Sequence, residues 1–387
     1  MRRQTAKRSS SGDVFLIVVL SLSLLIGLNF DRVQHWWTDL DIRLPQRTER
    51  ERFADRLLRS DLLSKEQRVA WDSAHRYAHQ AAPEIVLPHR ELLRSDSTFL
   101  QAAQAWQFDL PAGRELLLTQ KGHSNVFLEI YDRSGKLLTE TTPKTDSVVL
   151  EVKTGFDERL TVVAQTPPGT ALDREFFFHS RASLHFPVAH RDETAIKSFW
   201  GDRRDGGRRK HKGNDVFAPK GTPLLAVADG RVTRVRNGGL GGKTVWLRDG
   251  EGRPYNYYYA HLDSQLVRPG QRVRRGDTLG TVGNTGNART TPPHLHFGIY
   301  QPGGARDPFP FLKNPDREPP RPRSDFEAGS QRSIDAREPY YLRRRASQRE
   351  EAILRQLDVG EDVLLLGKAG RFARVRTRHG ELGYVAF

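Results

Sequence analysis

The sequence predicts a multidomain, mainly β protein with a membrane anchor and helices at its N-terminal end. Its 387 residues exceed what one domain usually contains. Apolar and polar residues alternate with a period of two in many stretches after Ser97, whereas helical spacing is concentrated before residue 82. We therefore expect a helical region, then a β-sandwich, an antiparallel β domain and a small C-terminal β-barrel.

The first thirty residues have the pattern of a signal anchor. Residues 1–12 contain four cations and no acid, and residues 13–30 contain the uncharged run from Val14 to Phe30. A run of this length can cross a bilayer as a helix, with its basic flank in the cytoplasm. Trp36 and Trp37 follow where an aromatic belt would lie. A cleaved signal peptide and a buried helix are the alternatives.

The composition limits the partners and the chemistry. A net charge of +15 indicates an anionic neighbour, such as nucleic acid, a membrane surface or an acidic cell-wall polymer. No nucleic-acid-binding motif is present, so we expect no nucleic acid as a partner. The chain has no cysteine, which excludes disulfides, thiolate metal sites and a catalytic thiol.

Two regions precede the segment that carries the chemistry. Residues 31–96 are predicted to be a helical region, because apolar residues recur at three- and four-residue steps from Arg47 to Ala82. His75 and His79 lie one helical turn apart there, and we interpret them as packing or solvated side chains. Residues 97–187 are predicted to form a β-sandwich, which resembles bacterial pre-peptidase modules and serves as a spacer or presents substrate.

A single strand is predicted to present two histidines on one face. Leu295, Phe297 and Ile299 alternate with His294 and His296. Side chains along a strand have a period of two, so the apolar side chains can enter a core while both imidazoles leave the opposite face. The two imidazoles can share a metal, or one can bind the metal while the other transfers protons. Two exposed strand histidines without a function are the plain alternative.

An upstream segment supplies further ligand types. Gly213 argues against a helix between His211 and Asp215, and a bend there can bring their side chains to one point. One imidazole nitrogen and one carboxylate oxygen suit zinc, and a third ligand leaves the fourth position for water. His296 or His294 is the natural third ligand. The histidine that remains, together with His261, is then available for acid–base chemistry.

Several motifs occur in an order that resembles a known family. They are His211-x-x-x-Asp215, Ala218 to Pro223, Ala228 to Val232, Tyr259-Ala260-His261-Leu262, and Gly283 to Gly286 leading to His294-Leu295-His296-Phe297. Residues 188–313 thereby resemble the lysostaphin-type (LytM-like) zinc metallopeptidases. The resemblance implies one Zn²⁺ per chain, bound by His211, Asp215 and His296. It implies that His261 and His294 are catalytic.

Two glycine-rich stretches are expected to form the walls of a substrate groove. They run from Asn237 to Gly242 and from Asn284 to Thr291. We predict that Asn237, Asn284 and Tyr259 contact substrate. As ordinary hairpin turns, the two stretches would need no function. Thr290-Thr291-Pro292-Pro293 stands where the family more often has a Gly-Pro step, which affects only the expected shape of that loop.

The C-terminal third is predicted to contain a linker and a small module. Residues 314–337 are rich in proline and charge, which is typical of a linker. Residues 338–387 resemble bacterial SH3-like modules, which commonly bind cell-wall peptides. A purely structural barrel is the alternative.

Together these features predict a zinc-dependent endopeptidase that hydrolyses peptide cross-links of peptidoglycan. We expect it in the cell envelope, anchored in the cytoplasmic membrane with its C-terminal domains in the periplasm or outside the cell. Peptidoglycan and the membrane are the expected partners, and other envelope partners are unknown. The alternatives are a non-catalytic scaffold, an activator of another wall hydrolase, or a peptidase that acts on secreted proteins.

Overall fold

The computed structural model describes residues 47–95, 97, 102–141, 148–314, 318–322 and 329–387. The predicted basic segment 1–12 and signal anchor 13–30 lie outside these residues. Among the described helices, none has both the length and the apolar character that crossing a membrane requires. The described chain consists mainly of antiparallel β-sheets with few helices, as the alternation predicts.

Two helices and one strand occupy the described part of the predicted helical region. Helix α3 spans Glu49–Arg59 and helix α4 spans Lys65–Gln80. The helix predicted from 47 to 82 is thus interrupted, and Ser64 starts α4 with a capping box to Gln67. The prediction that residues 31–96 are helical is wrong at its end, because His89–Ser95 forms strand β1.

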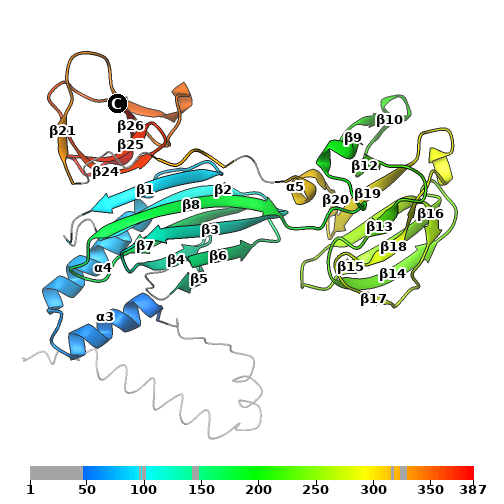
Figure 1. Cartoon of the computed structure of the whole chain (residues 1–387), viewed down its shortest axis with the longest axis horizontal. Coiled ribbons are helices and arrows are strands. Elements are labelled where there is room, and N and C mark those ends of the chain that lie inside the picture. Colours follow the sequence, from blue (N-terminus) through cyan, green and yellow to red (C-terminus); the bar gives the residue numbers. More distant parts are fainter. Residues whose placement is uncertain (1–46, 96, 98–101, 142–147, 315–317, 323–328) are drawn as a thin grey trace, which may run out of the picture. The chain divides into compact units, whose positions relative to one another are not determined.

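Strand β1 belongs to a β-sandwich in which a four-stranded sheet faces four strands of a larger sheet (Figure 1). Side chains of both layers share one core around Trp106, Phe176 and Phe178, so the predicted sandwich begins earlier than residue 97. Its strands, in spatial order, are β2 (Ala103–Leu110), β7 (Glu158–Gln165), β4 (Phe127–Tyr131) and β5 (Leu137–Thr141) in one layer, and β1, β8 (Leu172–Ala182), β3 (Arg114–Gly122) and β6 (Val148–Lys153) in the other.

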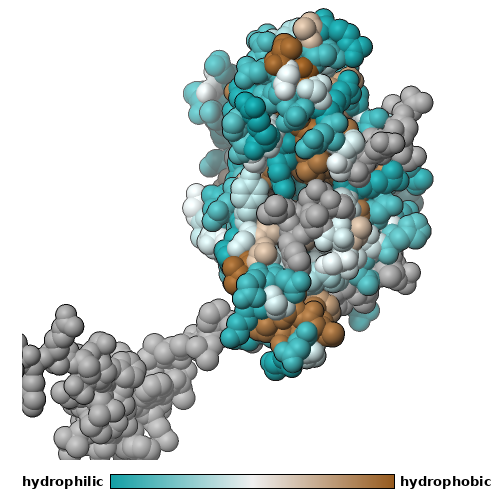
Figure 2. All heavy atoms as spheres, turned by 90° about the vertical axis from the view of Figure 1, so that its left-hand side faces the viewer, coloured by the Kyte–Doolittle hydropathy of each residue, from teal (hydrophilic) through white to brown (hydrophobic). Residues whose placement is uncertain are grey.

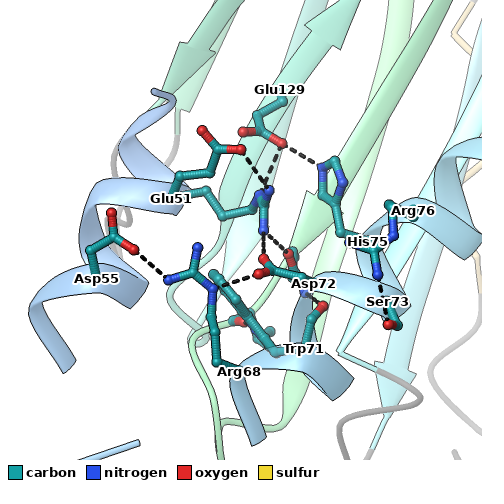
Figure 3. A network of polar contacts seen from close by, with 12 residues as sticks. Glu51, Asp55, Arg68, Trp71, Asp72, Ser73, His75, Arg76 and Glu129 are labelled. Atoms are coloured by element: carbon teal, nitrogen blue, oxygen red, sulfur yellow. Dashed lines mark hydrogen bonds and ion pairs between the residues drawn. The ribbon is translucent and has the colours of Figure 1, made fainter. Parts of the chain in front are cut away.

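A polar network fastens the two helices to the sandwich (Figure 3). The buried Glu129 on β4 accepts a hydrogen bond from His75 Nε2 on α4 at 2.5 Å. Arg68 on α4 pairs with Asp55 on α3 at 2.7 Å and with Asp72 on its own helix at 2.5 Å. His75 therefore has a packing role, as predicted, because its ring nitrogen is engaged by a buried carboxylate.

The C-terminal strands continue one layer of the sandwich. Strand β24 pairs with β1 through Leu92 with Lys368 and Leu93 with Gly367. The predicted barrel is therefore wrong as a closed unit, because β24 extends an open ten-stranded sheet. Part of the predicted linker is also a strand. The strands here are β21 (Gln331–Ser333), β22 (Tyr341–Arg343), β23 (Ile353–Gln356), β24 (Asp362–Ala369), β25 (Phe372–Thr377) and β26 (Leu382–Ala386).

A second ten-stranded antiparallel sheet fills the segment between the sandwich and the C-terminal strands. One of its faces covers a core that contains Tyr257, Tyr259, Leu295, Phe297 and Ile299. Its strands are β9 (Ile196–Ser198), β12 (Asn214–Phe217), β13 (Pro223–Leu225), β14 (Gly230–Arg236), β15 (Lys243–Asp249), β16 (Asn256–Gln265), β17 (Arg272–Val273), β18 (Thr278–Val282), β19 (His294–Gln301) and β20 (Gly304–Arg306). A separate hairpin, β10 (Arg203–Arg204) with β11 (Arg209–Lys210), precedes β12, and the short helix α5 (Phe309–Leu312) follows β20.

The surface is polar where it can be seen. The face shown in Figure 2 is mainly hydrophilic, with small hydrophobic patches between polar areas. Isolated apolar side chains on a surface are normal and need no partner. The side chains that can bind a metal or transfer protons are concentrated on and beside β12, β16 and β19.

Candidate metal centre

Two neighbouring strands set the position of the site. Strand β19 has the predicted alternation, since Leu295, Phe297 and Ile299 are fully buried in the core. In the antiparallel pairing of β12 with β19, Asp215 lies directly opposite His296. Residues directly opposite each other across two strands put their side chains on the same face. The carboxylate and the imidazole therefore meet on the face opposite the core.

Three side chains bring their ligand atoms to one point. His211 Nε2 lies 2.9 Å from His296 Nδ1 and 3.1 Å from Asp215 Oδ1. His296 Nδ1 lies 3.0 Å from the same carboxylate oxygen. His211 comes from the segment just before β12, without a helical turn between it and Asp215, as Gly213 predicts. The three predicted ligands are thus assembled from two distant parts of the chain.

The triangle formed by these three atoms has the dimensions of a zinc site. Two imidazole nitrogens and one carboxylate oxygen are ordinary zinc ligands at about 2.0–2.2 Å. The corners of a tetrahedron of that size lie about 3.3–3.5 Å apart. The observed edges of 2.9–3.1 Å are shorter by a few tenths of an ångström, so a small outward movement would admit the ion. The residues present therefore fit the metal that the sequence predicts.

Contacts outside the triangle orient its members. His211 Nδ1–H donates to the carbonyl oxygen of Phe199 at 2.9 Å, which leaves Nε2 unprotonated for a metal. Gly213 lies against the ring of His296, and a Cβ at this glycine would come within 2.8 Å of its Nε2. Only a residue without a side chain fits there, which gives Gly213 a packing role in addition to the bend.

A β-bulge turns His261 towards the site. Along β16, Tyr257 and Tyr259 are buried in the core, and strict alternation would point His261 to that core as well. The pairing with β15 shifts between Lys243 and Val245, and His261 has a φ of +66°. A bulge of this kind re-aims one side chain, and a strained backbone angle is typical of a functional position. Its ring centre lies 5.1 Å from that of His294.

The two predicted catalytic imidazoles are oriented in the same way, each by a hydrogen bond from Nδ1–H to a backbone carbonyl oxygen. His261 Nδ1–H donates to the carbonyl oxygen of Thr285, and His294 Nδ1–H donates to that of Pro292, each at 2.9 Å. This leaves the Nε2 atom of each ring directed away from these carbonyl contacts. His294 also stacks on Phe217 with a ring separation of 5.0 Å. The arrangement provides three candidate ligands and two oriented imidazoles in one place.

The surroundings shift the pKa values of the site. Burial raises the pKa of Asp215, but hydrogen bonds from His211 and His296 outweigh it and hold that pKa well below its usual range. Burial lowers the pKa of His261 to about 4, and the neighbouring His294 and His296 act in the same direction. Burial also lowers the pKa of His296. Near neutral pH, the carboxylate is therefore charged and His261 is neutral.

The site lies in a groove of about 490 Å³, which is lined by the three predicted metal ligands and the two predicted catalytic histidines. Among the described residues, Asn237, Asn284 and Tyr259 are not part of this lining. The predicted substrate contact of Tyr259 is wrong in this structure. Its ring is fully buried, and its hydroxyl accepts from Val227 N–H and donates to the carbonyl oxygen of Leu225, both at 3.0 Å.

The sequence reading missed residues that line the same groove. Arg204 donates to Asp215 Oδ2 and to Ser198 Oγ, each at 2.6 Å. Lys197, Arg209 and Lys212 also line the groove. The chain is rich in arginine and lysine throughout. No pattern therefore separated these cations from the other basic residues.

Comparison with known proteins shows that the segment around the site is similar to one family of peptidases. Residues 209–308 match the model of peptidase family M23. The chain is 36% identical over 140 residues to L-Ala–D-Glu endopeptidase of Bacillus subtilis (strain 168), covering 33% of this chain and 42% of that protein. It is 33% identical over 152 residues to peptidoglycan DD-endopeptidase ShyC of Vibrio cholerae serotype O1, covering 38% and 34%. It is 37% identical over 110 residues to glycyl-glycine endopeptidase ALE-1 of Staphylococcus capitis, covering 27% and 29%.

These matches are confined to one region of each protein. The chain spans less than half the length of the three relatives. The region matched by the family model includes the triangle of His211, Asp215 and His296, together with His261 and His294. Residues 209–308 are therefore similar to the peptidases of family M23 over the segment that carries the candidate site.

Proposed function

We propose that this protein is a zinc-dependent endopeptidase that hydrolyses peptide cross-links of peptidoglycan. The observation that carries the proposal is the convergence of His211, Asp215 and His296, with His261 and His294 beside them. Relatives named as peptidoglycan or glycyl-glycine endopeptidases add support through the same segment. One Zn²⁺ per chain would be bound by the three converging side chains.

The roles of the residues follow from their contacts. When bound, zinc supplies Lewis acidity towards the scissile carbonyl group and towards water. His261 is neutral near neutral pH, so it can accept a proton at Nε2. His294 is oriented by Pro292 in the same way. When its Nε2 carries a proton, His294 can donate a hydrogen bond to the carbonyl oxygen, and His261 can return the proton that it accepted to the leaving amine. No glutamate base is needed for this division of roles.

The cellular location belongs to the same proposal. The charge-free run in residues 13–30 with its basic flank supports an anchor in the cytoplasmic membrane. The peptidase domain would then lie in the periplasm or outside the cell, where its substrate is. A wall-binding role for residues 338–387 stays a prediction, and its open sheet gives no closed barrel to compare with SH3-like modules.

Digestion of purified sacculi tests the enzymatic proposal. We expect the zinc-loaded protein to release peptides whose masses identify the cleaved bond. His211→Ala should lose both zinc and hydrolysis, because it removes one corner of the triangle. His379→Ala is the matched control, since this exposed histidine lies far along the chain from the site. Circular dichroism of each variant, measured beside its zinc content, separates a lost metal from a lost fold.

The alternatives predict other outcomes. A non-catalytic scaffold or an activator would leave sacculi intact when incubated alone, although a second hydrolase could become active in its presence. A peptidase for secreted proteins would cut a glycine-rich protein and spare sacculi. Hydrolysis of sacculi that is equal for the wild type and His211→Ala would contradict the proposed site.

A further inference from the structure

The charges around the groove are divided unequally between its two sides. Apart from histidines, its charged lining residues are Lys197, Arg204, Arg209, Lys212 and Asp215, which all belong to the segment from β9 to β12. The other side is lined by Leu240, Gly241, Asn287, Ala288 and Thr291, none of which is charged. The groove thus has one basic wall and one neutral wall.

Two of these charged residues belong to the candidate metal centre, and the other three lie outside it. Arg204 and Asp215 are bonded to each other. Lys197, Arg209 and Lys212 are exposed at the edge of the groove. Within the described part of the chain, Lys197 and Lys212 have no acidic partner. We call Lys197, Arg209 and Lys212 the basic rim.

We propose that the basic rim selects peptide substrates that carry free carboxylates on the side facing β9 to β12. This inference rests on the proposed peptidoglycan endopeptidase function and specifies its substrate. Stem peptides with unmodified acidic residues present such carboxylates, whereas amidated stems and glycine bridges do not. A neutral peptide would leave Lys197 and Lys212 without an acidic partner, while an acidic one would bring opposite charges within a few ångströms of them.

The expected preference is moderate, because the rim is exposed to solvent. An exposed ion pair changes an equilibrium by about two- to fivefold. Two or three such contacts together predict a preference of about tenfold in kcat/KM. The preference should shrink as salt is raised from about 0.05 to 0.5 M, since the screening length falls to a few ångströms over that range.

Two cross-linked muropeptides that differ only in free or amidated stem carboxyl groups test the inference. The wild-type protein should favour the free acid by about tenfold in kcat/KM. In Lys197→Gln/Lys212→Gln, this ratio should fall below about threefold. Arg272→Gln/Arg274→Gln is the matched control, because it removes two exposed cations of the same domain that do not line the groove. Its ratio should equal that of the wild type.

The possible results are distinguishable. Equal cleavage of both muropeptides by the wild type overturns the selection by the rim and leaves the proposed endopeptidase function standing. If the double variant Lys197→Gln/Lys212→Gln has the same ratio of kcat/KM values as the wild type, the preference does not come from the basic rim and the inference is overturned. Cleavage of neither muropeptide, by a protein that binds zinc, overturns the proposed function and the inference with it.

Discussion

Arg204 and Asp215 form an ion pair in which Nη2 of the guanidinium donates to Oδ2 at 2.6 Å. The other carboxylate oxygen, Oδ1, is the one that faces His211 and His296. Arg204 thus binds one carboxylate oxygen of Asp215, while the other oxygen is directed to the candidate metal position. Partners of this kind fix the orientation of a ligand, and their loss typically costs about 10- to 100-fold in metal affinity.

We expect Arg204→Ala to weaken zinc binding by about 10- to 100-fold without unfolding the domain, because the arginine side chain is partly exposed. Competition with a chromophoric chelator measures the affinity directly. Arg204→Lys should recover only part of it, since Nη2 makes the contacts with both Ser198 and Asp215 and the lysine side chain is one bond too short to place its nitrogen there. Equal zinc affinities for the wild type and Arg204→Ala would remove this positioning role.

The second prediction concerns Gly213. A Cβ at this position would lie 2.4 Å from the carbonyl oxygen of Phe297 and 2.8 Å from His296 Nε2. Gly213→Ala should therefore displace β12 or the ring of His296 and reduce zinc affinity. It should also destabilise the domain by about 1–3 kcal/mol. Zinc titration and urea unfolding measure the two effects.

Gly155→Ala is the control for that substitution. No atom lies within 4 Å of a Cβ built at Gly155, so we expect neither zinc affinity nor stability to fall. A variant Gly213→Ala that binds zinc as tightly as this control would show that the sheet absorbs the extra carbon without moving His296.

The third prediction separates metal binding from catalysis. The ring centre of His261 lies 6.0 Å from that of His296, and the His261 side chain is not part of the ligand triangle. His261→Ala should keep its zinc and lose about 10²–10⁴-fold in kcat, which is the usual contribution of a positioned acid or base. Metal analysis and turnover on the same preparation test it. Loss of zinc together with turnover would make His261 a ligand instead.

The sequence was most informative where a simple period held. Leu295, Phe297 and Ile299 alternate with the histidines, and the structure keeps that alternation along β19. The local backbone conformation could also be predicted at Gly213, because a glycine there argues against a helix between His211 and Asp215. The backbone conformation at these positions is determined mainly by residues that are close in the sequence. A single sequence carries that information directly.

Other features depend on contacts that no local pattern reveals. The bulge at His261 puts Ala260 and His261 on the same side of the sheet, so the period of two fails at the residue that matters. Alternation counted back from His261 would place Tyr259 on the side of the site, whereas Tyr259 faces the core. The join of β24 to β1 links residues about 275 positions apart, and neither strand signals its partner.

A buried ion pair between β1 and β25, close to that join, leads to the fourth prediction. Glu91 on β1 and Arg374 on β25 are both fully buried, with Arg374 Nη1 3.4 Å from Glu91 Oε2. Trp106 Nε1–H also donates to Glu91 Oε2 at 2.5 Å, and the hydroxyl of Tyr384 donates to it at 3.2 Å. Breaking one side of such a pair costs about 3–5 kcal/mol, because the other charge remains buried. Glu91→Gln should lower the free energy of unfolding by about this amount at pH 7.

The pH dependence of that loss follows from the pKa of Glu91. Burial raises this pKa, but Arg374 and the hydrogen bonds from His89 and Trp106 outweigh burial and lower it from 4.5 to about 2. A carboxyl whose pKa is lower in the folded state stabilises the fold fully above its unfolded pKa, and the stabilisation is lost as the pH falls. The difference in unfolding free energy between the wild type and Glu91→Gln should therefore shrink by about 3 kcal/mol from pH 5 to pH 2. Urea unfolding at several pH values measures it, and a difference that does not change with pH would mean that Glu91 is protonated in the folded protein throughout.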